Sequence, residues 1–174
     1  MPNIFDTAKY ILKITGPISM WLLQGLCYYA KAWSLVWDDD ELFPEHFEAW
    51  AGGPVCPELL HRTTVIHEVD VSDIPDSALT GASLSADQMD TIDGVVRDYV
   101  HLFTHLSDDY LRMLATTEDP WIFARNGLPP GAKSSNPISE VRMRAYYRYQ
   151  ADEKILRRRY RREVEKGETN NAKH

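Results

Sequence analysis

Cysteine is scarce in this sequence of 174 residues, which contains only Cys27 and Cys56. Two cysteines allow one bridge at most, and a chain of this length does not need it, so a disulfide-stabilised scaffold is excluded and a cytoplasmic location is expected. Hydrophobic residues make up 44% of the chain and charged residues 26%. This composition excludes intrinsic disorder and favours one soluble domain around a single core.

Long apolar runs are also lacking. The most apolar stretch, between Lys13 and Lys31, has 17 uncharged residues and is interrupted by Gly16-Pro17. A membrane-spanning helix needs about 20 apolar residues, so no span is predicted. Ala30-Lys31-Ala32 has the small-x-small pattern of a signal-peptide cleavage site, which leaves a cleaved leader as an alternative. The helical register of apolar residues continues past that pattern to Trp37, which favours a retained helix.

Motifs for catalysis are missing from the sequence. It has no Gly-rich phosphate loop, no Gly-x-Ser-x-Gly elbow and no Ser-x-x-Lys, so nothing nominates a nucleophile. His101 and His105 have the spacing to share one helix face, but zinc proteases place a glutamate directly after the first histidine. The acidic run at 38–41 lacks the alternation of a calcium loop. We therefore expect no enzyme activity, no cofactor and no bound metal.

Charge is distributed unevenly along the chain. The formal net charge is −7, yet residues 140–174 hold 11 Lys and Arg against 6 Asp and Glu, while residues 1–139 hold 8 against 20. Five of these 11 basic residues form one run, whose arginines are Arg157, Arg158, Arg159, Arg161 and Arg162. Three interpretations remain open: an electrostatic dock for an acidic protein or for the chain's own body, a nucleic-acid contact, or a solvated helix end.

Hydrophobic periodicity predicts a mainly α (α+β) fold, a single helical domain with a small β-hairpin and a long C-terminal helix. The best-defined helix begins near Ile18, after the Gly16-Pro17 break. Its apolar residues recur at spacings of three and four and form one stripe, whereas Gln24, Lys31 and Ser34 lie off it. The stripe consists of Leu22, Leu26, Tyr29, Trp33 and Val36.

Start signals predict the later helices. Ser85 with Gln88 forms a capping box, and Thr117 precedes two acidic residues that suit a helix N-terminus. Asn136 as N-cap, with Pro137 at the first helical position, predicts the start of the long C-terminal helix. For the β-hairpin, Leu42-Phe43 and residues 47–50 are the predicted strands, and Gly52-Gly53-Pro54 ends the hairpin in a tight turn. The residues expected to be mostly buried are Leu26, Tyr29, Trp33, Trp50, Val96, Phe103 and Trp121.

Two ordered segments have a recognisable pattern. One helix reads Leu-x-Tyr-Tyr-Ala-x-x-Trp from Leu26 to Trp33, and residues 48–55 read Glu-Ala-Trp-x-x-Gly-Pro-Val. The sequence resembles the Panacea domain over about residues 3–150, a family that includes SocA-like and GepA-like phage-associated proteins. The structural motif residues of this resemblance are Leu26, Tyr29, Trp33, Trp50, Gly53, Pro54, Pro120 and Trp121. Family members commonly carry a histidine where this chain has Thr117 within residues 116–121, so a role tied to that histidine is not carried over.

What the resemblance implies is a cytoplasmic antitoxin that binds and neutralises a toxin encoded beside it, such as a small alarmone synthetase, without catalysis. One branch of the family instead delivers its toxin to the ClpXP protease, so a proteolytic adaptor is an alternative, and a DNA-binding repressor is another. The expected organisation is an antitoxin domain at 1–150 and a basic helix end and tail at 151–174. The arginine run at 157–162 is the predicted partner-binding segment, with no membrane contact and no nucleic acid expected.

Overall fold

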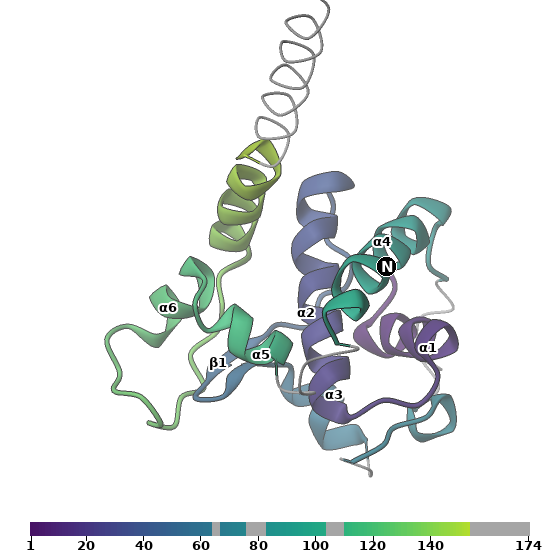
Figure 1. Cartoon of the computed structure of the whole chain (residues 1–174), viewed down its shortest axis with the longest axis horizontal. Helices are drawn as coiled ribbons and strands as arrows, with labels where there is room; N and C mark the ends of the chain where they lie inside the picture. The colour runs from purple at the N-terminus through teal and green to yellow at the C-terminus, as the bar shows by residue number, and fades with distance from the viewer. Residues whose placement is uncertain (64–66, 76–82, 104–109, 154–174) are drawn as a thin grey trace, which may run out of the picture.

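The computed structural model describes residues 1–63, 67–75, 83–103 and 110–153, with only the backbone at 100–103. The fold is mainly helical with one two-stranded antiparallel sheet, as the sequence predicts. One contiguous hydrophobic core joins the helices, whose arrangement Figure 1 shows. Among the helices in the described ranges, none combines the length and the apolar content needed to cross a bilayer.

The first two helices begin at side-chain caps. The side chain of Asn3 accepts hydrogen bonds from the backbone of Phe5 and Asp6 and opens α1 (Ile4–Thr15). Gly16, at a φ of +73°, ends that helix in a conformation that favours glycine. Ser19 then caps α2 (Met20–Trp37) by accepting from the backbone N–H of Leu22. The predicted break at Gly16-Pro17 is therefore confirmed.

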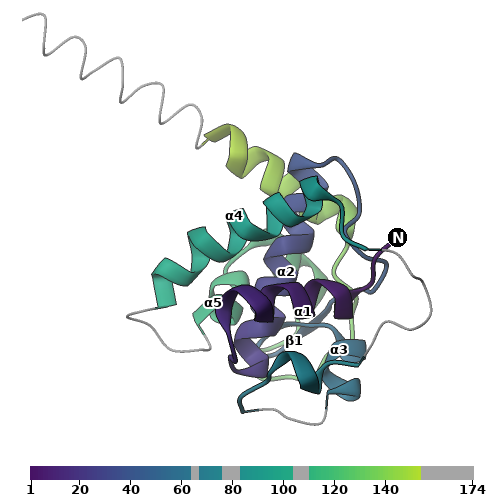
Figure 2. The same ribbon diagram turned by 90° about the vertical axis from the view of Figure 1, so that its right-hand side faces the viewer.

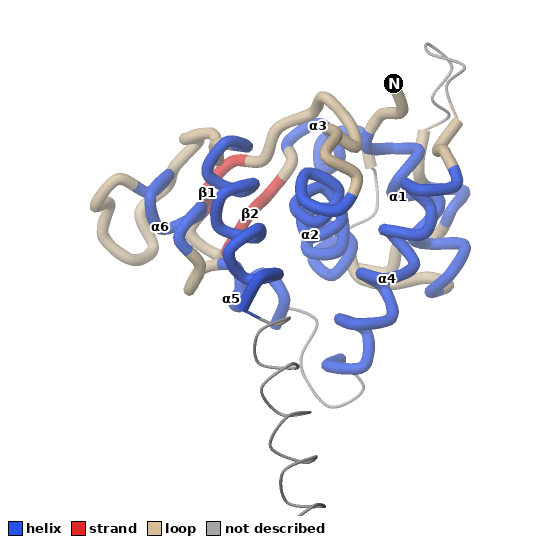
Figure 3. Tube along the Cα trace, turned by 90° about the horizontal axis from the view of Figure 1, so that it is seen from above, coloured by secondary structure: helices blue, strands red, loops and turns tan. Residues whose placement is uncertain are grey.

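Helix α2 lies at the centre of the molecule. It contacts α1, α4, α5 and β2, and Figure 3 shows it between α1 and α4 on one side and the sheet on the other. The helix is consequently buried on nearly all of its sides. The sequence predicted burial of one stripe only, so it underestimated the buried part of α2. Gln24, Lys31 and Ser34, off the predicted stripe, are buried as well. Each finds polar partners inside the protein, as burial requires.

The remaining helices pack around α2. Ser85 and Gln88 form the predicted capping box, and α4 (Ala86–Phe103) lies beside α1 in front of α2 (Figure 2). Shorter elements complete this part of the fold: α3 (Pro57–Arg62), the 3-10 helix η1 (Val71–Asp73), α5 (Tyr110–Ala115) and α6 (Asp119–Arg125). Helix α6 begins one residue later than predicted, because Glu118 and not Thr117 is the N-cap.

The β-hairpin keeps one of its two predicted strands, at residues 47–50, but its second strand lies elsewhere. Strand β1 (Glu48–Trp50) pairs with β2 (Gly53–Val55), so Leu42-Phe43 is not a strand and the glycine segment belongs to the hairpin instead of ending it. Gly53 has a φ of +123°, and a Cβ there would lie 2.7 Å from the carbonyl oxygen of Arg112. Glycine is therefore required both by the backbone conformation and by the close approach of α5.

The C-terminal helix begins later than the sequence predicts. Pro137 forms a β-bridge with Glu48, and the backbone N–H of Ile138 donates to the carbonyl of Phe47 at 2.7 Å. The helix then starts at residue 140, with the hydroxyl of Ser139 accepting from the Arg142 N–H. The predicted Asn136 cap is wrong because this segment extends the edge of the hairpin. The helix is described as far as residue 153.

Most of the burial predictions are confirmed. Leu26, Tyr29, Trp33 and Val96 are at most 5% exposed. The side chains of Trp50 and Trp121 are only half-buried. Trp121 packs against the edge of the core, and its Nε1 donates to the backbone carbonyl of Trp50 at 3.0 Å. The Phe103 side chain lies outside the described residues.

Candidate partner-binding surface

The residues considered for metal binding do not form a site in the part of the chain that the structure describes. There, no group of three or more His, Cys, Asp or Glu side chains has the arrangement to hold a metal ion. Asp39 of the acidic run pairs with Arg144 and Arg148. The side chain of His101, and all of His105, lie outside the described residues.

Both cysteines are buried free thiols. Burial raises the pKa of Cys27 well above its usual value, and burial also raises the pKa of Cys56 to about 12. Because the thiolate is the reactive form of cysteine, these side chains are held in the unreactive state at neutral pH. Their role here is packing, as the sequence predicts for Cys27.

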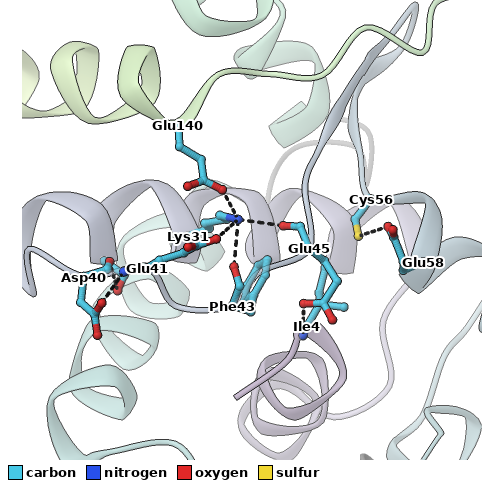
Figure 4. Close-up of polar contacts among 10 residues, drawn as sticks. Ile4, Lys31, Asp40, Glu41, Phe43, Glu45, Cys56, Glu58 and Glu140 are labelled. Atoms are coloured by element: carbon cyan, nitrogen blue, oxygen red, sulfur yellow. Dashed lines mark hydrogen bonds and ion pairs between the residues drawn. The ribbon is translucent and has the colours of Figure 1, made fainter. Parts of the chain in front are cut away.

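Lys31 makes the most extensive polar contacts in the core (Figure 4). Its Nζ donates to the backbone carbonyls of Phe43 at 2.9 Å and Glu45 at 2.7 Å, and it pairs with the carboxylates of Glu41 at 3.2 Å and Glu140 at 2.5 Å. The Lys31 side chain is 1% exposed. A buried ammonium needs such partners, and here they tie α2 to the 41–45 segment and to the first turn of the C-terminal helix.

A second polar contact involves Tyr29, which lies two residues before Lys31 on the same helix. The phenol hydroxyls of Tyr29 and Tyr147 both donate to Oε2 of Glu118, the N-cap residue of α6. Tyr29 stacks on Tyr99 with ring centroids 4.3 Å apart, and Tyr147 packs edge-on to Trp33 at 5.4 Å. Burial raises the pKa of Tyr29 and Tyr147 well above the usual value, so both phenols stay protonated and can donate to the carboxylate.

Arg125 closes the loop that follows α6. The Arg125 side chain is buried and donates to the backbone carbonyls of Ala49, Pro129 and Ala132 at 2.8–3.3 Å. All three acceptors are neutral backbone groups of this chain, so the guanidinium is used to fix the 126–132 loop against β1. Its role is structural.

The exposed apolar residues are concentrated on α6, its loop and the C-terminal helix. We call this the C-terminal surface, and its members are Ile122, Phe123, Leu128, Val141, Ala145 and Tyr149. Val141 is 81% exposed, Tyr149 60% and Phe123 58%. Single exposed apolar side chains are common, but a cluster of large ones on neighbouring elements is typical of an interaction site.

Contacts between α6 and the C-terminal helix join these residues into one surface. The guanidinium of Arg142 lies 3.5 Å above the Phe123 ring and pairs with Asp119 at 2.8 Å. Ile122 and Leu128, on α6 and its following loop, line a groove of about 370 Å³. The arrangement offers a partner an apolar area with arginine at its edge, which suits binding of a protein.

The predicted partner-binding arginines, 157–162, lie outside the described residues. The motif residues divide into two groups: Leu26, Tyr29 and Trp33 belong to the core around α2, whereas Gly53, Pro54, Pro120 and the two half-buried tryptophans shape the hairpin and the start of α6. The sequence analysis missed Lys31, Glu118 and the C-terminal surface. The only available signal for the surface was the spacing of four between Val141, Ala145 and Tyr149.

Comparisons of this chain with protein-family models, with curated proteins and with solved structures gave no match.

Proposed function

We propose that this chain is an antitoxin that neutralises a toxin by direct binding through the C-terminal surface. The observation that supports the proposal is the exposure of Phe123, Val141 and Tyr149 on elements held to the core by buried polar contacts. Exposing apolar side chains to water is unfavourable, and these side chains do not stabilise the core. Such a surface is expected where a partner protein covers it. The sequence resemblance to the Panacea domain gives the class of partner.

The test is co-expression with the protein encoded by the adjacent reading frame. We expect that protein to arrest growth when it is expressed alone, and to be harmless and to co-purify when this chain is present. Phe123→Ser should abolish rescue because it removes the aromatic ring next to Arg142 from an exposed position. Met113→Ser, which also removes an exposed apolar side chain (60% exposed) but on α5, is the matched control and should rescue fully.

Toxin lifetime separates direct inhibition from the adaptor alternative. An inhibitor suppresses toxicity while the toxin persists, whereas an adaptor shortens the toxin's half-life in cells that contain the ClpXP protease. An adjacent protein that is harmless alone and does not co-purify would contradict the antitoxin proposal. A repressor would instead bind operon DNA with an affinity that falls with salt at a slope of about 0.9 per phosphate neutralised.

A further inference from the structure

A pocket of about 600 Å³ lies beside the β-hairpin, and none of the residues of the C-terminal surface lines it. Three segments that are distant in the sequence form this pocket: β1 with the turn after it, α5, and residues 133–135. Helix α5 contacts β2, and Figure 3 shows it against the hairpin. The volume is within the range of about 300–1,000 Å³ that is typical of sites for small molecules.

Contacts within the chain hold the walls of the pocket in place. The guanidinium of Arg112 lies 4.1 Å from the centre of the Trp21 ring, and its Nη2 occupies the space that a Cβ on Gly52 would need. In the third segment, the hydroxyl oxygen of Ser134 accepts from the backbone N–H of Asn136 at 3.1 Å. The pocket is therefore preformed, which lowers the entropic cost of binding a ligand.

The pocket is more positive than the acidic chain around it. Residues 1–139 contain eight Lys and Arg, and two of these, Arg112 and Lys133, line this pocket. Glu48 is the only carboxylate among the described lining residues, and it already accepts from Trp50 Nε1 at 2.6 Å. Lys133 has no ion pair or hydrogen bond with any residue that the structure describes, so its charge is available to a ligand.

The rest of the lining adds hydroxyl groups and an aromatic ring. Ser134 and Ser135 both line the pocket, and because the Ser134 oxygen accepts from Asn136, its own hydrogen remains for an acceptor on a ligand. The half-buried ring of Trp50 lies in the same lining. Cationic side chains and hydroxyls favour an anionic oxygen, whereas an indole ring favours a flat apolar group.

We infer that this pocket binds a small molecule that carries a phosphate or carboxylate group on a flat apolar body. The anionic group lies toward Lys133 and the serine hydroxyls, and the flat body lies against the Trp50 ring. A cation would meet two positive side chains, and an uncharged apolar ligand would cover the Lys133 ammonium without pairing with it, which is unfavourable. The site is separate from the C-terminal surface and does not depend on the proposed function.

The experiment titrates the full-length chain at pH 7 with four probes and measures binding by calorimetry. Phenyl phosphate and benzoate carry the anionic group and the ring, inorganic phosphate lacks the ring, and phenol lacks the charge. At least one of the two ring-bearing anions should bind about 10-fold more tightly than either inorganic phosphate or phenol, and the tighter of the two identifies the anionic group. The inference is overturned if neither binds at concentrations up to about 10 mM, or if inorganic phosphate or phenol binds equally well.

Variants place the binding in this pocket. Lys133→Gln should raise the dissociation constant of the tighter anion about 10-fold, because it removes a charge-assisted contact. Gly52→Ala leaves the charge unchanged but adds a Cβ where Arg112 Nη2 lies, and it should also weaken binding, by about fivefold. Lys13→Gln makes the same charge change as Lys133→Gln at an exposed position on α1 and should bind within about twofold of the wild-type protein. Circular dichroism checks that all three variants are folded, and wild-type affinity of a folded Lys133→Gln protein would overturn the inference.

Discussion

Helix α2 and the C-terminal helix differ in which kind of side chain departs from the usual pattern of apolar residues inside and polar residues outside. Helix α2 buries Gln24, Lys31 and Ser34 among apolar neighbours, whereas the C-terminal helix exposes Val141 and Tyr149 to solvent. These three polar side chains of α2 each have hydrogen-bond partners within the protein, whereas the side chain of Val141 is 81% exposed. The buried polar residues of α2 therefore contribute to the stability of the fold, whereas the exposed apolar residues of the C-terminal helix are the ones expected to bind a partner.

The largest expected effect is the loss of stability at alkaline pH, which results from the buried thiols and phenols on and around α2. Burial raises the pKa of Cys27 and of the phenols of Tyr28 and Tyr147, and it raises that of Cys56 to about 12. Above about pH 8.5 the unfolded chain loses thiol protons that the folded chain keeps, so stability falls as pH rises, by about 1.4 kcal/mol per pH unit for each group. The tyrosines add to this loss above about pH 10.

The measurement is the free energy of unfolding in urea between pH 7 and pH 11. In a variant with Cys27→Ala and Cys56→Ala, the decline should begin near pH 10 instead of 8.5, because only the phenols then titrate. A stability that stays flat to pH 11 would show that the groups around α2 are accessible to water.

Trp33→Ala tests the apolar packing of α2. Trp33 is 3% exposed, packs edge-on to Tyr147 and donates from Nε1 to the Tyr99 hydroxyl at 3.0 Å. The free energy of unfolding should fall by about 3–5 kcal/mol, the usual cost of removing a buried aromatic ring. Trp37→Ala, at the half-exposed ring stacked on Trp33, is the control and should cost much less. Equal losses in the two variants would contradict the assignment of the buried face.

Lys31→Met tests the polar contacts of α2. The methionine keeps much of the volume but leaves the carbonyls of Phe43 and Glu45 without a donor, so we expect a loss of about 3 kcal/mol in urea unfolding. The two carboxylates that pair with Lys31 are about one-third exposed and can be hydrated, which limits the loss. The control is the exposed Lys13, whose replacement by methionine should change stability by less than about 0.5 kcal/mol.

Val141→Gln should have the smallest effect on folding. The side chain is 81% exposed, and glutamine is the better helix former, so the free energy of unfolding should stay within about 0.5 kcal/mol of the wild-type value. A loss above 1 kcal/mol would mean that Val141 packs within this chain, and the contrast between the two helices would then weaken.

The sequence predicted the elements whose signals are local. The break at Gly16-Pro17 and the capping box at Ser85 and Gln88 depend on neighbouring residues, and both were predicted correctly. The hairpin was misplaced because Gly52-Gly53-Pro54 has the residues of a terminator, and only the approach of α5 shows that a glycine strand is needed there. The fold class and the strand at residues 47–50 could be predicted, but the position of the second strand could not.

The contacts that position the candidate surface could not be predicted from local sequence signals. Lys31 and Glu140 are 109 positions apart, and Tyr29 meets Glu118 across 89, so no spacing rule connects them. The C-terminal helix has valine, methionine, alanine and tyrosine on all sides, and its inward face is decided only by where it lies on α2. Without that contact, Tyr147 and Tyr149 are equivalent candidates for the core.

The two buried contacts that hold the C-terminal helix have a consequence for the cost of association. Disordered recognition segments lose conformational entropy when they bind, and that loss reduces affinity. Here residues 140–149 are already ordered when the chain folds, because Lys31 pairs with Glu140 and Glu118 accepts from Tyr147. Their loss of conformational entropy is therefore part of the free energy of folding. The part of the C-terminal surface that this helix carries is therefore preorganised, and the Tyr149 hydroxyl is already held by its hydrogen bond to Glu153.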